Sequence, residues 1–201
     1  MSDPMLVLAS QSKARRAMLE AAGVTVDTRP ADIDESTLRE GWKAKGLLAN
    51  DLAAALAEAK AISLSPEIGT ALVLGGDQIL ALQDDLMLDK PLDKAEAKSH
   101  LRLLSGKKHQ LFSAAVITEQ GVRIWRHVAI ATLTMRHLSD DFINDYVNAE
   151  WDDIRHCVGC YEIEGRGAQL FDDINGCQFT IMGLPLLELL DFLRTREIMA
   201  S

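Results

Sequence analysis

The sequence predicts an α/β protein in which a mixed, twisted β-sheet is flanked by helices. Short apolar runs typical of buried strands alternate along the chain with segments whose apolar residues have helical spacing. Two long alternating runs joined by a short turn predict an antiparallel hairpin, so the sheet should be mixed. A length of 201 residues with 48% apolar residues suits one globular unit, and we expect residues 1–201 to form a single domain without a separable linker.

The first half of the chain combines strands with two helices. Ser12 can cap the start of the first helix and Gly23 can end it, whereas Gly75 and Gly76 are expected to break a buried strand at its C-terminal end. The expected elements are a strand at 5–9, a helix at 13–22, a strand at 24–28, a polar loop at 30–36, a helix at 47–63 and a strand at 70–74.

The second half contains the long hairpin and a Gly-rich tract. Lys90 should lie in a loop, because the residue before a proline is driven toward an extended conformation. The expected elements are a small hairpin at 79–88 turning at Asp84-Asp85, a helix at 93–104, strands at 110–118 and 122–135, a helix at 139–147, an irregular tract at 157–178 and a helix at 184–194.

Charge and hydropathy exclude several classes of function. The formal net charge of −9 opposes binding to nucleic acid or to an anionic membrane, because both need long-range attraction to phosphate. No apolar run is long enough to span a bilayer, and the N-terminus lacks the basic stretch of a signal peptide. We therefore expect a cytoplasmic protein.

A candidate phosphate site lies where the first strand meets the first helix. Ser10, Ser12, Lys13, Arg15 and Arg16 cluster there, and the free backbone N–H groups of a helix N-terminus attract anions. Taken alone, this pattern is found more often in an ordinary capped helix with solvated basic residues.

Three further segments carry candidate groups, each with an ordinary alternative. Asp34 and Glu35 could supply oxygen ligands to Mg²⁺, although acidic pairs in loops are usually solvated. Asp77 follows a predicted buried strand, where ligands often bind α/β sheets, yet a turn-forming aspartate is equally common after glycine. Lys90 could contact a phosphate as a point charge, but a single exposed lysine usually has no such role.

The three cysteines form no strong metal or redox motif. Cys157 and Cys160 have the C-x-x-C spacing beside His156, but a closed zinc site needs four ligands and only Cys177 adds a third thiol. Ordinary thiols near a Gly-rich loop are the expected case. The sequence also lacks P-loop, dinucleotide-binding, zinc-protease and nucleophile-elbow motifs.

In their order along the chain, these pieces resemble the Maf family of nucleoside triphosphate pyrophosphatases, and the resemblance covers nearly the whole chain. The segments that carry it are LASQSKARRAMLEAAGV at 8–24, IDE at 33–35, LAEAKA at 56–61, GGDQIL at 75–80, DKP at 89–91, LRLLSGKKHQLFSAAVI at 101–117, residues 157–171, and GLPLLELLDFL at 183–193.

The resemblance implies a fold and a reaction. The implied fold is an elongated α/β structure similar to inosine triphosphate pyrophosphatases, with a mixed twisted sheet forming two lobes around a central cleft. The implied reaction cleaves a nucleoside triphosphate between its α- and β-phosphates, giving a nucleoside monophosphate and pyrophosphate, and requires a divalent cation such as Mg²⁺, Mn²⁺ or Co²⁺. Such enzymes are thought to cleanse the nucleotide pool or to affect cell division, and a homodimer is implied.

The resemblance also implies roles for individual residues. Asp77 matches the proton acceptor and Glu35 matches the acid near the metal, so both are expected to hold or orient the cation. Ser10, Arg15, Lys60 and Lys90 match the positions that handle the phosphates, with Ser12 beside them. A triphosphate carries about four negative charges, which a cation and several basic groups would balance.

Three positions bear on the base. Gln78 and Glu164 match the branch of the family that acts on 7-methyl-GTP, and a carboxylate at position 164 can accept hydrogen bonds from a guanine. That branch carries a Trp at the position of Ala14. We expect a guanine or methylguanine triphosphate as substrate, with dTTP or UTP as the alternative.

Two other functions compete with this prediction. The chain could be a non-enzymatic binding protein of cell division or septum formation, in which case the candidate residues would have no reason to converge. It could also be a different metal-dependent phosphohydrolase, one that releases phosphate instead of pyrophosphate.

Overall fold

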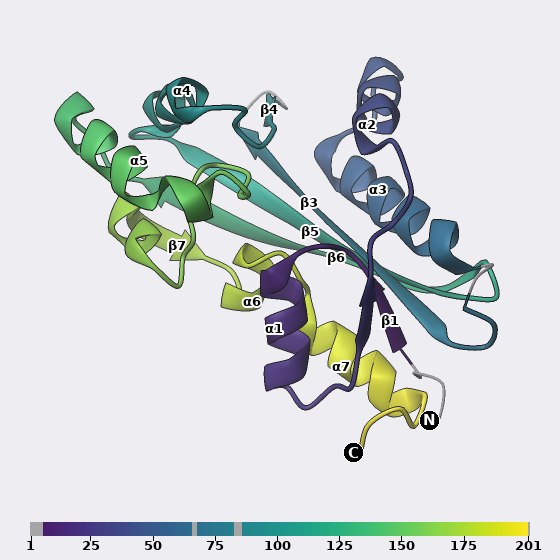
Figure 1. The fold of residues 1–201 in the computed structure, drawn as a ribbon. Coiled ribbons are helices and arrows are strands. Elements are labelled where there is room, and N and C mark those ends of the chain that lie inside the picture. The colour runs from purple at the N-terminus through teal and green to yellow at the C-terminus, as the bar shows by residue number, and fades with distance from the viewer. Residues whose placement is uncertain (1–5, 66–67, 83–85, 201) are drawn as a thin grey trace.

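A computed structural model describes residues 6–65, 68–82 and 86–200, and it contains one seven-stranded mixed sheet (Figure 1). The strands are β1 (Leu6–Ala9), β2 (Asp27–Arg29), β3 (Leu72–Leu82), β4 (Met87–Leu88), β5 (Lys108–Glu119), β6 (Val122–Met135) and β7 (Phe171–Asn175). The helices are α1 (Lys13–Ala21), α2 (Glu35–Ala44), α3 (Ala49–Leu64), α4 (Lys94–Leu104), α5 (Asp140–Ile154), a 3₁₀ helix (Arg166–Leu170), α6 (Gln178–Ile181) and α7 (Leu186–Thr195).

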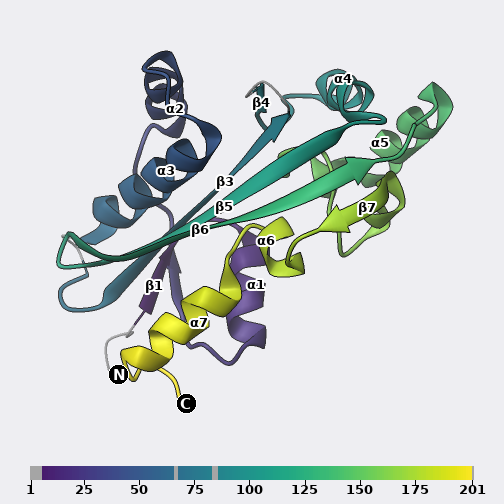
Figure 2. The ribbon, with the colours of Figure 1, turned by 180° about the vertical axis from the view of Figure 1, so that it is seen from behind.

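The strand order is β2-β1-β3-β5-β6-β7, with β4 paired to β3. β1 runs parallel to both of its neighbours, and every other pairing is antiparallel. Helices cover both faces of the sheet (Figures 1 and 2). The fold is therefore the predicted α/β class with a mixed sheet.

Alternation along β1 and β3 assigns the helices to the two faces. Leu6 and Leu8 pack with α1 and α7, whereas Val7 and Ala9 pack with α3. This is the period of two that a strand buried on both sides requires. The same alternation sets the face of the sheet to which each side chain of β3 points.

Separate apolar clusters mark two lobes. One cluster joins α4 and α5 to the far ends of β3, β5 and β6, and includes Leu101 and Tyr146. The other clusters lie around β1, α1, α3 and α7. The long strands β3 and β5 run through both parts, as Figure 1 shows.

The prediction that Gly75-Gly76-Asp77 breaks a strand is wrong. β3 continues without interruption from Leu72 to Leu82, because β5 pairs with it along its whole length, including Asp77 with Ala114. The glycines instead allow close packing. A Cβ on Gly75 would lie 1.9 Å from the carbonyl oxygen of Ala57 in α3, so only glycine lets this helix approach.

Other predicted boundaries change where long-range pairing decides them. The small hairpin forms through the pairing of Leu80 with Leu88, and its predicted turn at Asp84-Asp85 lies outside the described residues. The tract at 157–178 is not wholly irregular, since β7 pairs with β6 through Leu133 and Ile174. The helix predicted at 139–147 continues to Ile154.

The polar loop predicted at 30–36 ends earlier than expected, at helix α2. Asp34 caps this helix by accepting a hydrogen bond from the backbone N–H of Thr37. Leu38 and Trp42 are the apolar side chains that α2 packs against the cluster around α3. Two apolar residues one turn apart are a weak helical signal, which is why the sequence pattern did not predict α2.

Substitution of Asp34 by Ala should destabilise the protein near neutral pH and have less effect in acid. Hydrogen bonds from Thr37 and Ser36 lower the pKa of Asp34 from 3.8 to about 2. A depressed pKa in the folded state adds stability above the ordinary pKa, and this contribution is lost as the pH falls toward 2. The difference in Tm between wild type and Asp34→Ala should therefore shrink from about pH 5 to about pH 2. A difference that stays constant across this range would contradict the capping role.

Among the described residues, no helix combines the length and the apolar character needed to cross a membrane.

Candidate active site

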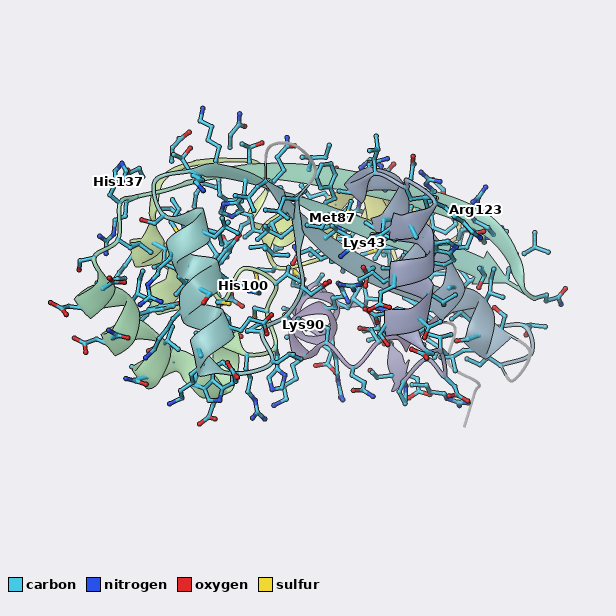
Figure 3. The ribbon with its side chains drawn as sticks, turned by 90° about the horizontal axis from the view of Figure 1, so that it is seen from above. Lys43, Met87, Lys90, His100, Arg123 and His137 are labelled. Carbon is cyan, nitrogen blue, oxygen red and sulfur yellow. The ribbon has the colours of Figure 1, made fainter. Side chains whose placement is uncertain are left out.

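All ten residues predicted for the site line one cleft of about 870 Å³. They are Ser10, Ser12, Ala14, Arg15, Glu35, Lys60, Asp77, Gln78, Lys90 and Glu164. The cleft lies between the two lobes, since its lining includes Ser10 at the end of β1 and Tyr161 of the cluster around α5. Seen from above, Lys90 lies between the α2 side and the α4 side of the molecule (Figure 3).

The topology of β1 and β3 explains the position of Asp77. β1 ends at Ala9, which pairs with Gly75, so Asp77 lies just beyond the carboxyl end of β1. Alternation along β3 turns Asp77 toward α3, as it does Gly75. Gln78 points to the opposite face and contacts α6. Asp77 and Gln78 therefore enter the cleft from opposite faces of the sheet.

Lys60 joins the two predicted acids. Its Nζ lies 2.7 Å from Oδ1 of Asp77 and 2.6 Å from Oε2 of Glu35. Asp77 and Lys60 are buried, whereas the Glu35 side chain is 37% exposed. Burial opposes ionisation of Glu35, but the charges of Lys60, Arg39 and Lys90 outweigh it and lower its pKa. Glu35 is therefore a carboxylate at neutral pH.

Arg39 is a site residue that the sequence pattern did not predict. Its Nη2 lies 2.7 Å from Oε1 of Glu35 and 3.9 Å from Oδ2 of Asp77, and its Nη1 donates a hydrogen bond to Asp89. Burial favours loss of its proton, but Asp77, Asp89 and Glu35 more than compensate and raise its pKa. The spacing of Glu35 and Arg39 by four residues was the available signal, because such pairs meet on one face of a helix.

Arg15 is buried at the floor of the cleft. Its Nε donates to the carbonyl oxygen of Gly183 at 2.7 Å, and its Nη1 donates to Oγ of Ser10 at 3.2 Å. Burial lowers the pKa of Arg15, while Asp77 and Glu35 oppose the shift. The guanidinium is thus oriented by the protein before any ligand binds.

Of the other residues predicted for a phosphate site at the start of α1, some line the cleft and one does not. Ser12 is the N-cap of α1 and accepts a hydrogen bond from the N–H of Arg15 at 3.3 Å. Lys13 also lines the cleft. Arg16 does not: it is exposed and pairs with Glu20 one turn along the helix. Arg16 thus lies on the outer face of α1 and has the role of a solvated basic residue, which was the ordinary alternative for this cluster.

Lys90 adds a further positive charge. Desolvation in the cleft and the nearby charges of Arg15 and Lys60 lower the pKa of Lys90, while Glu35 and Asp77 oppose this. The charged form of a lysine that is repelled by nearby cations is stabilised when an anion binds beside it. The environment of Lys90 is therefore complementary to a phosphate group.

Gln78 and Glu164 present hydrogen-bond acceptors to the cleft. Nε2 of Gln78 donates to the carbonyl oxygens of Thr180 and Ile181 at 3.0 Å and to Oγ of Ser113 at 2.9 Å. These contacts engage the amide nitrogen, so the oxygen is the group left for a ligand. Glu164 is exposed and also lines the cleft.

The cysteines have the properties of ordinary thiols. Cys157, Cys160 and Cys177 are free, and burial raises the pKa of both Cys157 and Cys160 to about 12. Thiols that stay protonated are poor nucleophiles and poor metal ligands. Within the described part of the chain, no group of three or more His, Cys, Asp or Glu side chains is placed to hold a metal ion.

Glu35 and Asp77 nevertheless suit a divalent cation that a ligand helps to bind. Oδ2 of Asp77 is buried and has no hydrogen-bond partner among the residues that the structure describes. Mg²⁺ is commonly held by one or two carboxylates together with water and substrate phosphates. The two carboxylates therefore fit such an ion, with the remaining ligands coming from outside the protein.

The chain has close relatives along nearly its whole length. A protein of Sphingopyxis alaskensis described as a nucleoside triphosphate pyrophosphatase is 50% identical over 94% of this chain and 96% of its own. A protein of Mesorhizobium japonicum described as a 7-methyl-GTP pyrophosphatase is 48% identical over 94% of this chain and 95% of its own. A solved HAM1 protein from Coxiella burnetii covers 65% of this chain and 72% of its own, with 16% identity and a TM-score of 0.42, which is too distant a likeness to bear on the site.

The model of the Maf-like protein family matches residues 5–196, a span that includes every residue of the cleft described above. Together with relatives that are half identical over nearly the full length, this match shows that the chain belongs to the Maf family.

Proposed function

We propose that this protein is a nucleoside triphosphate pyrophosphatase, a hydrolase that cleaves its substrate between the α- and β-phosphates. The observation that carries the proposal is the bridge of Lys60 between Glu35 and Asp77, with Arg15 and Lys90 in the same cleft. The relatives named for this activity support it.

The charges in the cleft are suited to a triphosphate. Arg15 and Lys90 offer two positive charges to a substrate that carries about four negative ones, whereas the charge of Lys60 is already balanced by Glu35 and Asp77. Arg15, Lys60 and Asp77 are buried, and charges act more strongly away from bulk water than in it. The net charge of −9 on the whole chain makes this local gathering of cations more informative.

A divalent cation completes the proposal, and Glu35 and Asp77 are the residues that would hold it. When bound, such an ion would neutralise phosphate charge and make water easier to ionise. The protein's own groups do the rest. Arg15 and Lys90 bind the phosphates, and Lys60 holds the carboxylates of Glu35 and Asp77 close to each other.

The proposed reaction is a hydrolysis with pyrophosphate as the leaving group. A water oxygen forms a bond to the α-phosphorus, and the bond from that phosphorus to the oxygen bridging to the β-phosphate breaks. The proton of the water passes to Asp77, whose Oδ2 accepts no hydrogen bond from the described residues. The products are a nucleoside monophosphate and pyrophosphate.

We further propose a guanine or 7-methylguanine triphosphate as the substrate. The oxygen of Gln78 and the carboxylate of Glu164 are acceptors, and the edge of a guanine offers donors at N1 and at the exocyclic amine. The relative named for 7-methyl-GTP supports this choice. A homodimer and a cytoplasmic location complete the proposal, and neither rests on the geometry of the site.

A panel of triphosphates tests the proposal. With Mg²⁺, Mn²⁺ or Co²⁺, pure protein should release pyrophosphate from GTP or 7-methyl-GTP faster than from dTTP or UTP, with pyrophosphate and phosphate measured separately. Release of phosphate alone would instead favour another phosphohydrolase. Faster release of pyrophosphate from dTTP or UTP than from the guanine nucleotides would reverse the proposed base preference. The absence of turnover with all three metals would favour a non-enzymatic binding protein of cell division.

A further inference from the structure

Helix α2 carries a site residue but is weakly anchored by apolar packing. Glu35 is the first residue of α2, and no residue of the helix is fully buried. Leu38 and Trp42 are only partly buried where they pack on the cluster around α3. The position of Glu35 therefore depends on how the polar side of α2 is held.

Arg39 supplies that polar attachment. It contacts Glu35 on its own helix, Asp77 in the middle of β3, and Asp89 in the segment that leads to Lys90. These three acids come from parts of the chain up to 54 residues apart (Glu35 to Asp89). The Arg39 side chain is only 13% exposed, so these contacts are shielded from solvent more than a surface ion pair is.

We propose that Arg39 is a positioning residue that holds Glu35 against Lys60 and ties α2 to the segment carrying Lys90. A single side chain thereby fixes the position of Glu35 and Asp77 relative to the segment that carries Lys90. The planar fork donates hydrogen bonds to Glu35 and Asp89 in fixed directions and keeps its charge 3.9 Å from Asp77, an arrangement that a lysine ammonium does not reproduce. The consequence for turnover rests on the proposed function, whereas the attachment of α2 does not.

Contact of Arg39 with the triphosphate itself is the alternative. The guanidinium already faces three carboxylates, so its charge is balanced by the protein. A residue that acts by positioning should affect kcat more than KM, because it sets the geometry of other groups and adds no binding contact. A residue that binds phosphate should raise KM.

The kinetic test compares Arg39→Gln, Arg39→Lys and Lys43→Gln. Lys43 is the matched control, because it lies on the same helix and, of the acids in the described ranges, pairs with Asp89 alone, at 3.3 Å. We expect Arg39→Gln to lower kcat about 100-fold, the loss typical of a misplacement of about 1 Å, with KM changed less than about threefold. Arg39→Lys should recover only part of kcat, and Lys43→Gln should stay within about threefold of wild type.

A second measurement needs no turnover. Hydrogen–deuterium exchange of the α2 amides should speed up about tenfold in Arg39→Gln, with α3 unchanged and Lys43→Gln close to wild type. If wild type turns over nothing while α2 loosens as expected, the proposed function fails and the attachment stands. Exchange and kcat that both stay near wild type in Arg39→Gln would overturn the inference, as would a rise in KM at constant kcat.

Discussion

Replacement of Asp77 by Asn is expected to lower the rate of pyrophosphate release about 1,000-fold, within the range that a general base contributes. The amide has nearly the shape of the carboxylate but cannot take the proton of the attacking water. It also removes one of the two carboxylates available to a cation. The loss should appear in kcat measured by pyrophosphate release at saturating substrate and metal.

The structure predicts that Asp77→Asn still folds. Lys60 keeps its ion pair with Glu35 at 2.6 Å, so its charge is not left alone in the protein. Asp51→Asn is a matched control, because Asp51 is an exposed acid whose partner Arg126 is 3.4 Å away and outside the cleft. Its activity should equal that of wild type. Full turnover in a folded Asp77→Asn protein would remove Asp77 from the mechanism.

The sequence could predict the site residues that lie in motifs whose order along the chain resembles the Maf family. Ser10 and Arg15 share one segment, Lys60 and Asp77 lie in two others, and the structure brings all four to one cleft. Arg39 was missed because it belongs to a helix that the pattern did not show. The partners that give Arg39 its place, Asp77 and Asp89, lie on β3 and beyond β4, and no local pattern connects them.

The fold was predictable where local patterns agree with the final packing. The long hairpin of β5 and β6 forms where alternation predicts it, and the helices α1 and α3 form where helix-forming residues predict them. β7 was missed because its alternation is weak and its stability comes from pairing with β6, a contact between distant segments. Local propensity cannot report such a partner.

Gly75 shows the same limit in a single residue, and its replacement by Ala should destabilise the protein strongly. Glycine before an aspartate suggests a turn, yet Gly75 lies inside a continuous strand. Its added methyl group would lie 1.9 Å from the backbone oxygen of Ala57 and 2.9 Å from the backbone nitrogen of Ala61. Backbone atoms cannot rotate away as a side chain can, so α3 would have to shift.

We expect Gly75→Ala to lower the free energy of unfolding by about 3 kcal/mol or more, which is severe overpacking, and to lower Tm by about 10 °C. Gly41→Ala is the matched control: Gly41 lies in α2 with nothing within 4 Å of its added Cβ, so alanine should stabilise that helix by about 0.5–1 kcal/mol. Chemical denaturation of both variants separates the two cases. Because α3 also carries Lys60, a Gly75→Ala protein that folds should lose activity as well, since a displaced helix pulls Nζ of Lys60 away from Asp77. A Gly75→Ala protein as stable as wild type would mean that α3 can withdraw from β3 without cost, and the close packing that sets Lys60 against Asp77 would then not depend on this glycine.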